Sequence, residues 1–246
     1  MFKSLRKLIS QFLRTSVAPN YWSLIRKQSK SSLEIFLIEP EFNYLSRLAI
    51  DNGTDKGYLY NDSKFTHSYT DFYHLLLQFN RFSTLSVLEF GIGSTDKKYQ
   101  NNMGVGGKPG ASLRMWRDYF PNANIYGADI DSSILFEDNR IKTFYLDALR
   151  VETFRPVIDS LPSQLDLIVD DSLHTFDAGK NLFENFFYLL SKGGYYIIED
   201  VDLTLAERYI MYLKTRGVCF NFVRLQTPFF SVLSNNNLIV ITNQIQ

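Results

Sequence analysis

The chain has 246 residues, a formal net charge of zero and a hydrophobic content of 45%. This is enough for one large α/β domain, with or without an appendage. Because no overall basic charge attracts nucleic acid, we expect no nucleic-acid partner. Cys219 is the single cysteine, which excludes an internal disulfide framework and fits a reducing, cytoplasmic setting. No apolar run approaches the ~20 residues that span a bilayer.

The first fifty residues differ in pattern from the rest. Residues 1–30 carry lysines and arginines without any acid, since the first acid is Glu34, and their apolar residues recur at helical spacing. This predicts a basic amphipathic helix, which packs on the domain or on a second subunit or makes a peripheral contact with an anionic membrane surface. An organellar presequence is a third interpretation. With a second helical region over 33–50, interrupted at Pro40, residues 1–50 are predicted to form an N-terminal helical extension.

Residues 51–246 alternate strand patterns with helix patterns, which is typical of a single doubly wound α/β domain with a mostly parallel sheet. The run from Asp166 to Asp170 is apolar between its ends without alternation, as in a central strand covered on both faces. Seven strands are expected, near residues 86–90, 123–129, 142–147, 166–171, 195–200, 218–224 and 238–242. Helices are expected near residues 71–79, 111–119, 178–190 and 203–215.

Acidic residues stand where five of these strands end. Ligands of open α/β sheets bind beyond the carboxyl ends of the strands, so these acids point to one binding rim. Gly91 and Gly93 follow the first strand, and such glycines let a ligand approach the backbone closely. The pair of glycines is weak evidence by itself, whereas five acids in step with the α/β alternation are stronger. The acids are Glu89, Asp129, Asp147, Asp171 and Asp200.

Together these motifs resemble class I S-adenosylmethionine-dependent methyltransferases. A closer resemblance is to the metal-dependent sugar O-methyltransferases of the macrolide (mycinamicin) type, and it covers about residues 50–202. That family usually has Gly-Ser where this chain has Ser172-Leu173. The matching segments are Gly53–Gly57, His67–Tyr73, Gly110–Pro121, Asp170–His174 and Ile198–Asp200.

The resemblance implies a seven-stranded sheet of order 3-2-1-4-5-7-6 with the last strand antiparallel. It also implies S-adenosylmethionine as the cofactor. An acid after the second strand, Asp129, is expected on the ribose, and Asp147 after the third is expected near the adenine. The full set of expected cofactor contacts is Lys56, His67, Tyr69, Glu89, Gly91, Gly93, Ser112, Asp129, Asp147 and Asp170.

The same sheet order makes strands one, four and five neighbours, about 4.8 Å apart. Glu89, Asp171 and Asp200 are therefore candidate ligands of one cation. An oxygen-rich set favours Mg²⁺ or another hard divalent cation over zinc. In the resembled family, carboxylates matching Asp171 and Asp200 hold the metal, and the histidine matching His174 is the base, so Asp171 and His174 are the predicted catalytic residues. The acid matching Glu89 contacts the cofactor in most class I methyltransferases.

The predicted reaction is O-methylation of a sugar hydroxyl. A metal bound by two vicinal sugar oxygens orients the acceptor and lowers the pKa of its hydroxyl, and a histidine can take the proton near neutral pH. A free sugar, a nucleotide sugar and a glycosylated small molecule all remain open as acceptors, and a homo-oligomer is expected.

Three other functions compete with this prediction. Against an NAD-dependent oxidoreductase, no third glycine follows Gly91 and Gly93 at the required place, and Asp129 lies 40 residues beyond Glu89, whereas a dinucleotide fingerprint places its acid ~20 residues on. A metal-independent methyltransferase of a small-molecule acceptor also fits. The third is a non-catalytic binding module that keeps the fold.

Overall fold

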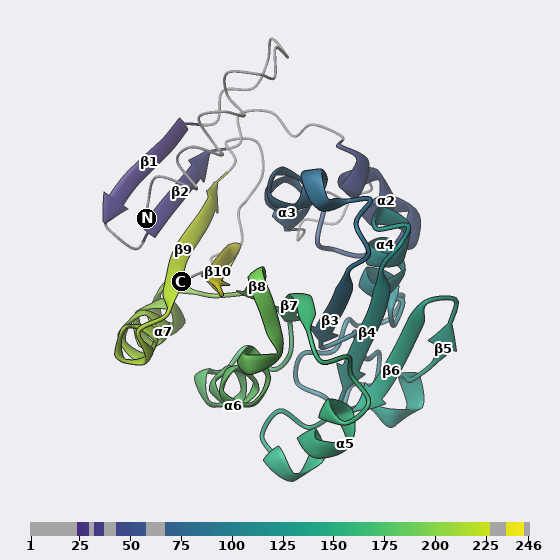
Figure 1. The fold of residues 1–246 in the computed structure, drawn as a ribbon. Helices are drawn as coiled ribbons and strands as arrows, with labels where there is room; N and C mark the ends of the chain where they lie inside the picture. Colours follow the sequence, from purple (N-terminus) through teal and green to yellow (C-terminus); the bar gives the residue numbers. More distant parts are fainter. Residues whose placement is uncertain (1–23, 30–31, 37–42, 58–66, 227–234, 244–246) are drawn as a thin grey trace.

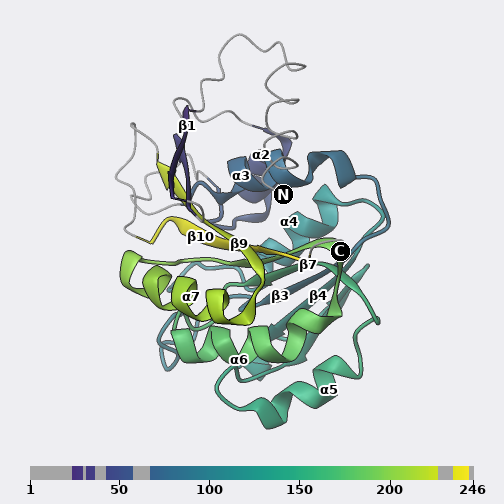
Figure 2. The same ribbon diagram turned by 60° about the vertical axis from the view of Figure 1, so that its left-hand side comes forward.

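The fold is a mixed β-sheet with helices on both faces (Figures 1 and 2). The structure, a computed structural model, describes residues 24–29, 32–36, 43–57, 67–226 and 235–243. Most of the predicted basic helix, residues 1–23, lies outside these ranges. Within them, no helix is both long and apolar enough to cross a membrane.

The sheet has ten strands in the order β1-β2-β9-β10-β8-β7-β3-β4-β6-β5. Its central seven run β6-β4-β3-β7-β8-β10-β9, which is the predicted order 3-2-1-4-5-7-6. β10 is antiparallel to both of its neighbours, so the antiparallel last strand is confirmed. These strands are β3 (Ser86–Phe90), β4 (Asn124–Asp129), β6 (Ile141–Tyr145), β7 (Leu165–Asp170), β8 (Leu190–Ile198), β9 (Cys219–Gln226) and β10 (Asn237–Thr242).

Three further strands extend the sheet beyond the seven that were expected. β5 (Glu137–Asp138) pairs antiparallel with β6. At the other edge, β1 (Leu24–Ser29) and β2 (Ser32–Phe36) form a hairpin, and β2 runs parallel to β9. The helical prediction is therefore wrong for residues 24–29 and 32–36. The alternation in Leu33-Glu34-Ile35 suits a strand, and the edge of β9 offers unpaired backbone groups to it.

The second N-terminal helix is found at α2 (Tyr44–Asn52), shorter than expected. Asn43 caps it, since its side-chain oxygen accepts a hydrogen bond from Ser46 N at 2.9 Å. Gly53 ends the helix in the left-handed conformation with φ 80°, where glycine carries no steric penalty. The chain then turns directly into the segment that contains Lys56.

The helices bury one core on each face of the sheet (Figure 2). α2, α3 (Tyr69–Leu77) and α4 (Ala111–Tyr119) cover one face, and α5 (Phe154–Ile158), α6 (Phe176–Phe186) and α7 (Leu203–Arg216) cover the other. Successive strand residues point to opposite faces. In β7, Val169 accordingly lies in the first core and Ile168 in the second. The same alternation determines which of the adjacent residues Asp170 and Asp171 reaches the site.

Candidate active site

A cavity of about 500 Å³ opens at the carboxyl ends of the central strands, within the size range of small-molecule sites. It lies where the acids and glycines were expected to converge. Nine of the predicted site residues line it: Lys56, Gly91, Gly93, Ser112, Asp129, Asp147, Asp171, His174 and Asp200.

The glycine turn after β3 brings two strand ends into close contact. Gly91 has φ 81°, and a Cβ added there would lie 2.0 Å from the carbonyl oxygen of Asp171. Only glycine fits both the backbone angle and the space. Gly93 also has a left-handed φ of 86°. The turn therefore fixes the distance between the β3 end of the cavity and Asp171.

Asp129 and Asp147 lie at the far side of the cavity, after β4 and β6. Asp129 accepts hydrogen bonds from Ile92 N at 2.8 Å and from Asp131 N at 2.9 Å. Burial raises the pKa of Asp129, although these backbone donors oppose the rise. Asp147 accepts from Leu149 N at 3.0 Å. Both side chains border the same space, as two contacts of one bound nucleoside would require.

The loop between Gly93 and Gly110 covers part of the cavity. Asn101 Nδ2 donates to the carbonyl oxygen of Leu173 at 2.8 Å, so the loop is tied to the turn that carries the candidate base. Ser94 Oγ donates to Asp131 at 2.5 Å and fixes the start of the loop.

Three side chains converge at the rim of this cavity: Asp171 after β7, His174 in the following turn and Asp200 after β8. One ligand atom from each lies within 4.8 Å of the others. His174 Nε2 lies 3.5 Å from Asp200 Oδ2 and 3.9 Å from Asp171 Oδ1. His174 and Asp200 have φ values of 53° and 54°, a region that non-glycine residues rarely adopt and that often marks functional sites. The two carboxylates offer oxygen ligands that fit a hard divalent cation, and the imidazole nitrogen of His174 lies beside them.

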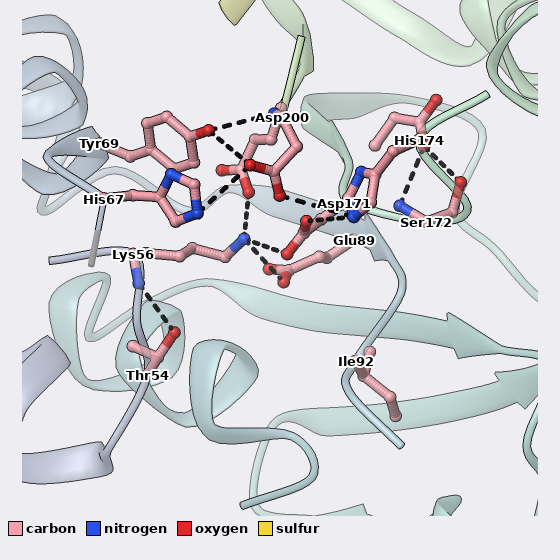
Figure 3. Close-up of polar contacts among 12 residues, drawn as sticks. Thr54, Lys56, His67, Tyr69, Glu89, Ile92, Asp171, Ser172, His174 and Asp200 are labelled. Carbon is pink, nitrogen blue, oxygen red and sulfur yellow. Dashed lines mark hydrogen bonds and ion pairs between the residues drawn. The ribbon is translucent and has the colours of Figure 1, made fainter. Parts of the chain in front are cut away.

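Lys56 occupies the centre of a buried ionic cluster beside these residues (Figure 3). Only 2% of its side chain is exposed, and Nζ lies 2.6 Å from Asp171 Oδ2 and 3.5 Å from Glu89 Oε1. It also contacts Glu199. Burial alone would lower the pKa of Lys56, but the three carboxylates outweigh it and raise the pKa. Lys56 was predicted to contact the cofactor. The structure shows that it forms ion pairs with the buried carboxylates of the site.

Glu199 belongs to the site, although the sequence did not mark it as a site residue. Its second oxygen accepts a hydrogen bond from the Tyr73 hydroxyl at 2.6 Å. Burial raises the pKa of Glu199 well above its usual range, and Lys56 opposes the rise. The signal that could have found Glu199 is the adjacent pair of acids at the end of β8.

Glu89, predicted as a metal ligand or a cofactor contact, lies outside the trio of Asp171, His174 and Asp200. It is fully buried, and its Oε2 accepts a hydrogen bond from Trp116 Nε1 at 2.6 Å. Its Oε1 faces Lys56 Nζ at 3.5 Å, and Glu89 is not among the residues that line the cavity. We therefore leave Glu89 out of the proposed ligand set.

Asp170, predicted as a cofactor contact, lies on the opposite side of the sheet from Asp171. It is buried, accepts a hydrogen bond from Ser172 Oγ at 2.6 Å, and lies against Gly179 of α6, where an added Cβ would approach it to 2.9 Å. Strand alternation turns it into the second core. Asp170 is not among the residues that line the cavity, so we leave it out of the proposed cofactor contacts.

His67 and Tyr69, also predicted as cofactor contacts, contact Asp200. Tyr69 OH lies 3.1 Å and His67 Nε2 3.3 Å from Asp200 Oδ1, and the two rings stack with centroids 4.5 Å apart. Neither residue is among those that line the cavity. Their contacts link them to the carboxylates of the trio.

No family model matches this chain. Several curated relatives match part of it, including the following two. The 8-demethyl-8-(2-methoxy-alpha-L-rhamnosyl)-tetracenomycin-C 3'-O-methyltransferase of Streptomyces olivaceus is 32% identical over 165 residues, covering 67% of this chain and 38% of the relative. Mycinamicin VI 2''-O-methyltransferase of Micromonospora griseorubida is 32% identical over 137 residues, covering 56% of this chain and 32% of the relative. The chain thus spans less than two fifths of the length of these relatives.

A solved structure of the MycE methyltransferase from the mycinamycin biosynthetic pathway, in complex with Mg and SAH, has a TM-score of 0.59. It is 22% identical, and the match covers 83% of this chain and 55% of that one. This likeness establishes the class I methyltransferase fold. The predicted resemblance to sugar O-methyltransferases is confirmed by the curated relatives.

Proposed function

We propose that this chain is an S-adenosylmethionine-dependent O-methyltransferase that acts on a sugar hydroxyl of a glycosylated small molecule. The observation that carries the proposal is the convergence of Asp171, His174 and Asp200 within 4.8 Å at the rim of a cavity that also meets the glycine turn. The names of the relatives describe O-methylation of a rhamnosyl tetracenomycin and of mycinamicin VI, which supports this acceptor class.

The cofactor occupies the cavity between the glycine turn and the ends of β4 and β6. Gly91 and Gly93 bring the backbone close to it, Asp129 accepts hydrogen bonds from the ribose hydroxyls, and Asp147 lies near the adenine. Asp129 already accepts hydrogen bonds from backbone N–H groups, but a carboxylate has about four acceptor positions, so it can also accept from the ribose. Ser112 lines the same wall.

A divalent cation, with Mg²⁺ as the candidate because the MycE complex contains Mg, is held by Asp171 and Asp200. Mg²⁺ in proteins is commonly bound by one or two carboxylates, with the other positions left to water or substrate. When bound, such an ion orients two vicinal sugar oxygens and lowers the pKa of the acceptor hydroxyl. The two carboxylates supply the negative charge, while Lys56 balances part of the charge of Asp171.

His174 removes the proton from the acceptor. Its Nε2 faces the two carboxylates and receives the proton as the acceptor oxygen forms its bond to the methyl carbon. The carbon–sulfur bond of the sulfonium breaks at the same time, giving a methyl ether and S-adenosylhomocysteine. General-base assistance of this kind typically contributes about 10²–10⁴-fold.

The test is mass spectrometry of acceptors incubated with isotope-labelled S-adenosylmethionine and Mg²⁺. The acceptor panel contains free sugars, nucleotide sugars and rhamnosylated polyketides. We expect labelled methyl ether on a glycosylated acceptor, and loss of the label after treatment with a chelator. Full turnover without metal would favour the metal-independent methyltransferase. Absence of methylation across the panel, with the cofactor bound, would refute the sugar acceptor.

The NAD-dependent oxidoreductase finds less support than the methyltransferase. Dinucleotide-binding sheets have the strand order 3-2-1-4-5-6, whereas β10 here inserts antiparallel between β8 and β9. The homo-oligomer and the membrane contact through residues 1–30 stay predictions.

A further inference from the structure

The two oxygens of Asp200 have different surroundings. Oδ1 accepts from Asn235 Nδ2 at 2.8 Å and from Tyr69 OH at 3.1 Å, and His67 Nε2 lies 3.3 Å away. Oδ2 instead faces His174 Nε2 at 3.5 Å. One oxygen is thus anchored by an amide, a hydroxyl and an imidazole, and the other points toward His174.

The two oxygens of Asp171 also have different surroundings, but a different group anchors one of them. Its Oδ2 is bound by the Lys56 ammonium at 2.6 Å, and its Oδ1 faces His174 Nε2 at 3.9 Å. The anchor of Asp171 is a cation, whereas the hydrogen-bond donors on Asp200 Oδ1 are an amide and a hydroxyl, with the His67 imidazole beside them.

Asn235 is the first of three consecutive asparagines at the turn into β10. Asn236 Nδ2 donates to Ser68 Oγ at 3.0 Å and to Leu225 O at 3.2 Å. Asn237 Nδ2 donates to Val201 O at 2.7 Å. All three attach the closing hairpin to the rest of the molecule, but Asn235 is the one whose amide reaches a carboxylate of the site.

We propose that Asn235 and Tyr69 are positioning residues that restrict Asp200 to ligation through Oδ2 alone. The inference rests on the proposed function, since it takes a divalent cation between Asp171 and Asp200. A free carboxylate rotates about its terminal bond and can offer either oxygen or both, and donors on Oδ1 remove that freedom. The φ of 54° at Asp200 fixes the backbone from which the side chain projects.

Single-oxygen ligation determines which cation the site prefers. Mg²⁺ and cations of similar size require near-octahedral geometry, which suits one oxygen per carboxylate, whereas Ca²⁺ also accepts a carboxylate through both oxygens. With Oδ1 held by Asn235 and Tyr69, a second bond from Asp200 is blocked. The two residues therefore favour the smaller cation over Ca²⁺.

The test measures Mn²⁺ binding to the full chain, without substrate, by the electron paramagnetic resonance signal of free Mn²⁺, with Ca²⁺ as competitor. Loss of partners that orient a metal ligand typically costs 10–100-fold in affinity. For Asn235→Ala and Tyr69→Phe we expect Mn²⁺ affinity at least about tenfold lower, and a smaller loss for Ca²⁺, so that the preference for Mn²⁺ over Ca²⁺ declines. Tyr69→Phe removes a single hydroxyl and keeps the ring stacked on His67, so it remains informative if Asn235→Ala does not fold.

Asn236→Ala is the matched control, because it removes the same amide one residue away and breaks more hydrogen bonds of the hairpin. It should lower the melting temperature yet bind Mn²⁺ like the wild type. If Asn236→Ala weakens Mn²⁺ binding as much as Asn235→Ala, docking of the hairpin is the cause and the positioning role is refuted. Wild-type affinity in both Asn235→Ala and Tyr69→Phe would refute it too. A wild-type chain that binds no Mn²⁺ would refute the proposed metal site itself, and this inference with it.

Discussion

Replacing Lys56 with methionine removes the ammonium that three carboxylates share, while the apolar stem of the side chain stays. At 3.5 Å from Glu89, one such pair is worth about 5 kcal/mol of Coulomb energy at an effective dielectric constant of ~20. Part of this is offset, because a buried ammonium also loses its hydration. Removing one partner of a buried ion pair costs about 3–5 kcal/mol. We expect a loss of unfolding free energy of that size at pH 8.

The loss should depend on pH. Burial raises the pKa values of Glu199 and Glu89, and Lys56 lowers both. Without Lys56 these values rise further, so the folded variant binds protons that the unfolded chain, with glutamate pKa values of about 4.3, has released. Stability falls with pH wherever the folded state binds more protons. The deficit of the variant should therefore grow from pH 5 to pH 8.

Urea unfolding followed by circular dichroism, at both pH values and without metal, measures this deficit. Lys142→Met is the matched control, since Lys142 forms an exposed pair with Glu137 at 3.9 Å and such pairs contribute about 0–1 kcal/mol. Adding Glu199→Gln to Lys56→Met should recover part of the loss, because one buried charge disappears. The reasoning is refuted if Lys56→Met costs no more than Lys142→Met at pH 8, or costs the same at both pH values.

Three further changes probe the site. His174→Ala should slow methyl transfer by about 10²–10⁴-fold in single-turnover kinetics with cofactor affinity near wild type; a normal rate of transfer would reject His174 as the base. Asp129→Ala should weaken S-adenosylmethionine binding in calorimetry, and unchanged affinity would remove Asp129 from the ribose site. Gly91→Ala should lower the melting temperature far more than Gly193→Ala. Both glycines have φ 81°, but the new Cβ meets the Asp171 carbonyl at 2.0 Å in one case and nothing within 4 Å in the other; equal losses would contradict the close approach.

The strands of the central sheet and its acidic rim could be predicted because they depend on local patterns, whereas the order of the strands followed from the family resemblance. Five of the expected strands end in an acid, and the carboxyl ends of parallel strands meet at one edge. Asp171, His174 and Asp200 were found in this way. The β1–β2 hairpin was not predicted. β2 pairs with a strand almost two hundred residues away, and its five residues are too short a pattern to exclude a helix.

The ion pairs within the site could not be predicted from the sequence. Lys56 meets Asp171 and Glu199 across 115 and 143 positions, and no local pattern marks such a pairing. The sequence also placed both Asp170 and Asp171 in the site, the first as a cofactor contact and the second as a metal ligand, although Asp170 is the last residue of β7 and faces the core, and Asp171 is the first residue beyond it. Which of two adjacent acids reaches a site depends on strand parity and on the residue at which the strand ends.

The insertion of β10 between β8 and β9 affects how the chain matures during synthesis. Until β10 has been made and has folded, β8 and β9 lack their shared neighbour, and exposed strand edges of this kind invite pairing with other chains. Arrival of β10 closes both edges and brings Asn235 to Asp200 in the same step. Formation of this strand therefore covers two strand edges and completes the contacts of the Asp200 carboxylate in a single folding step.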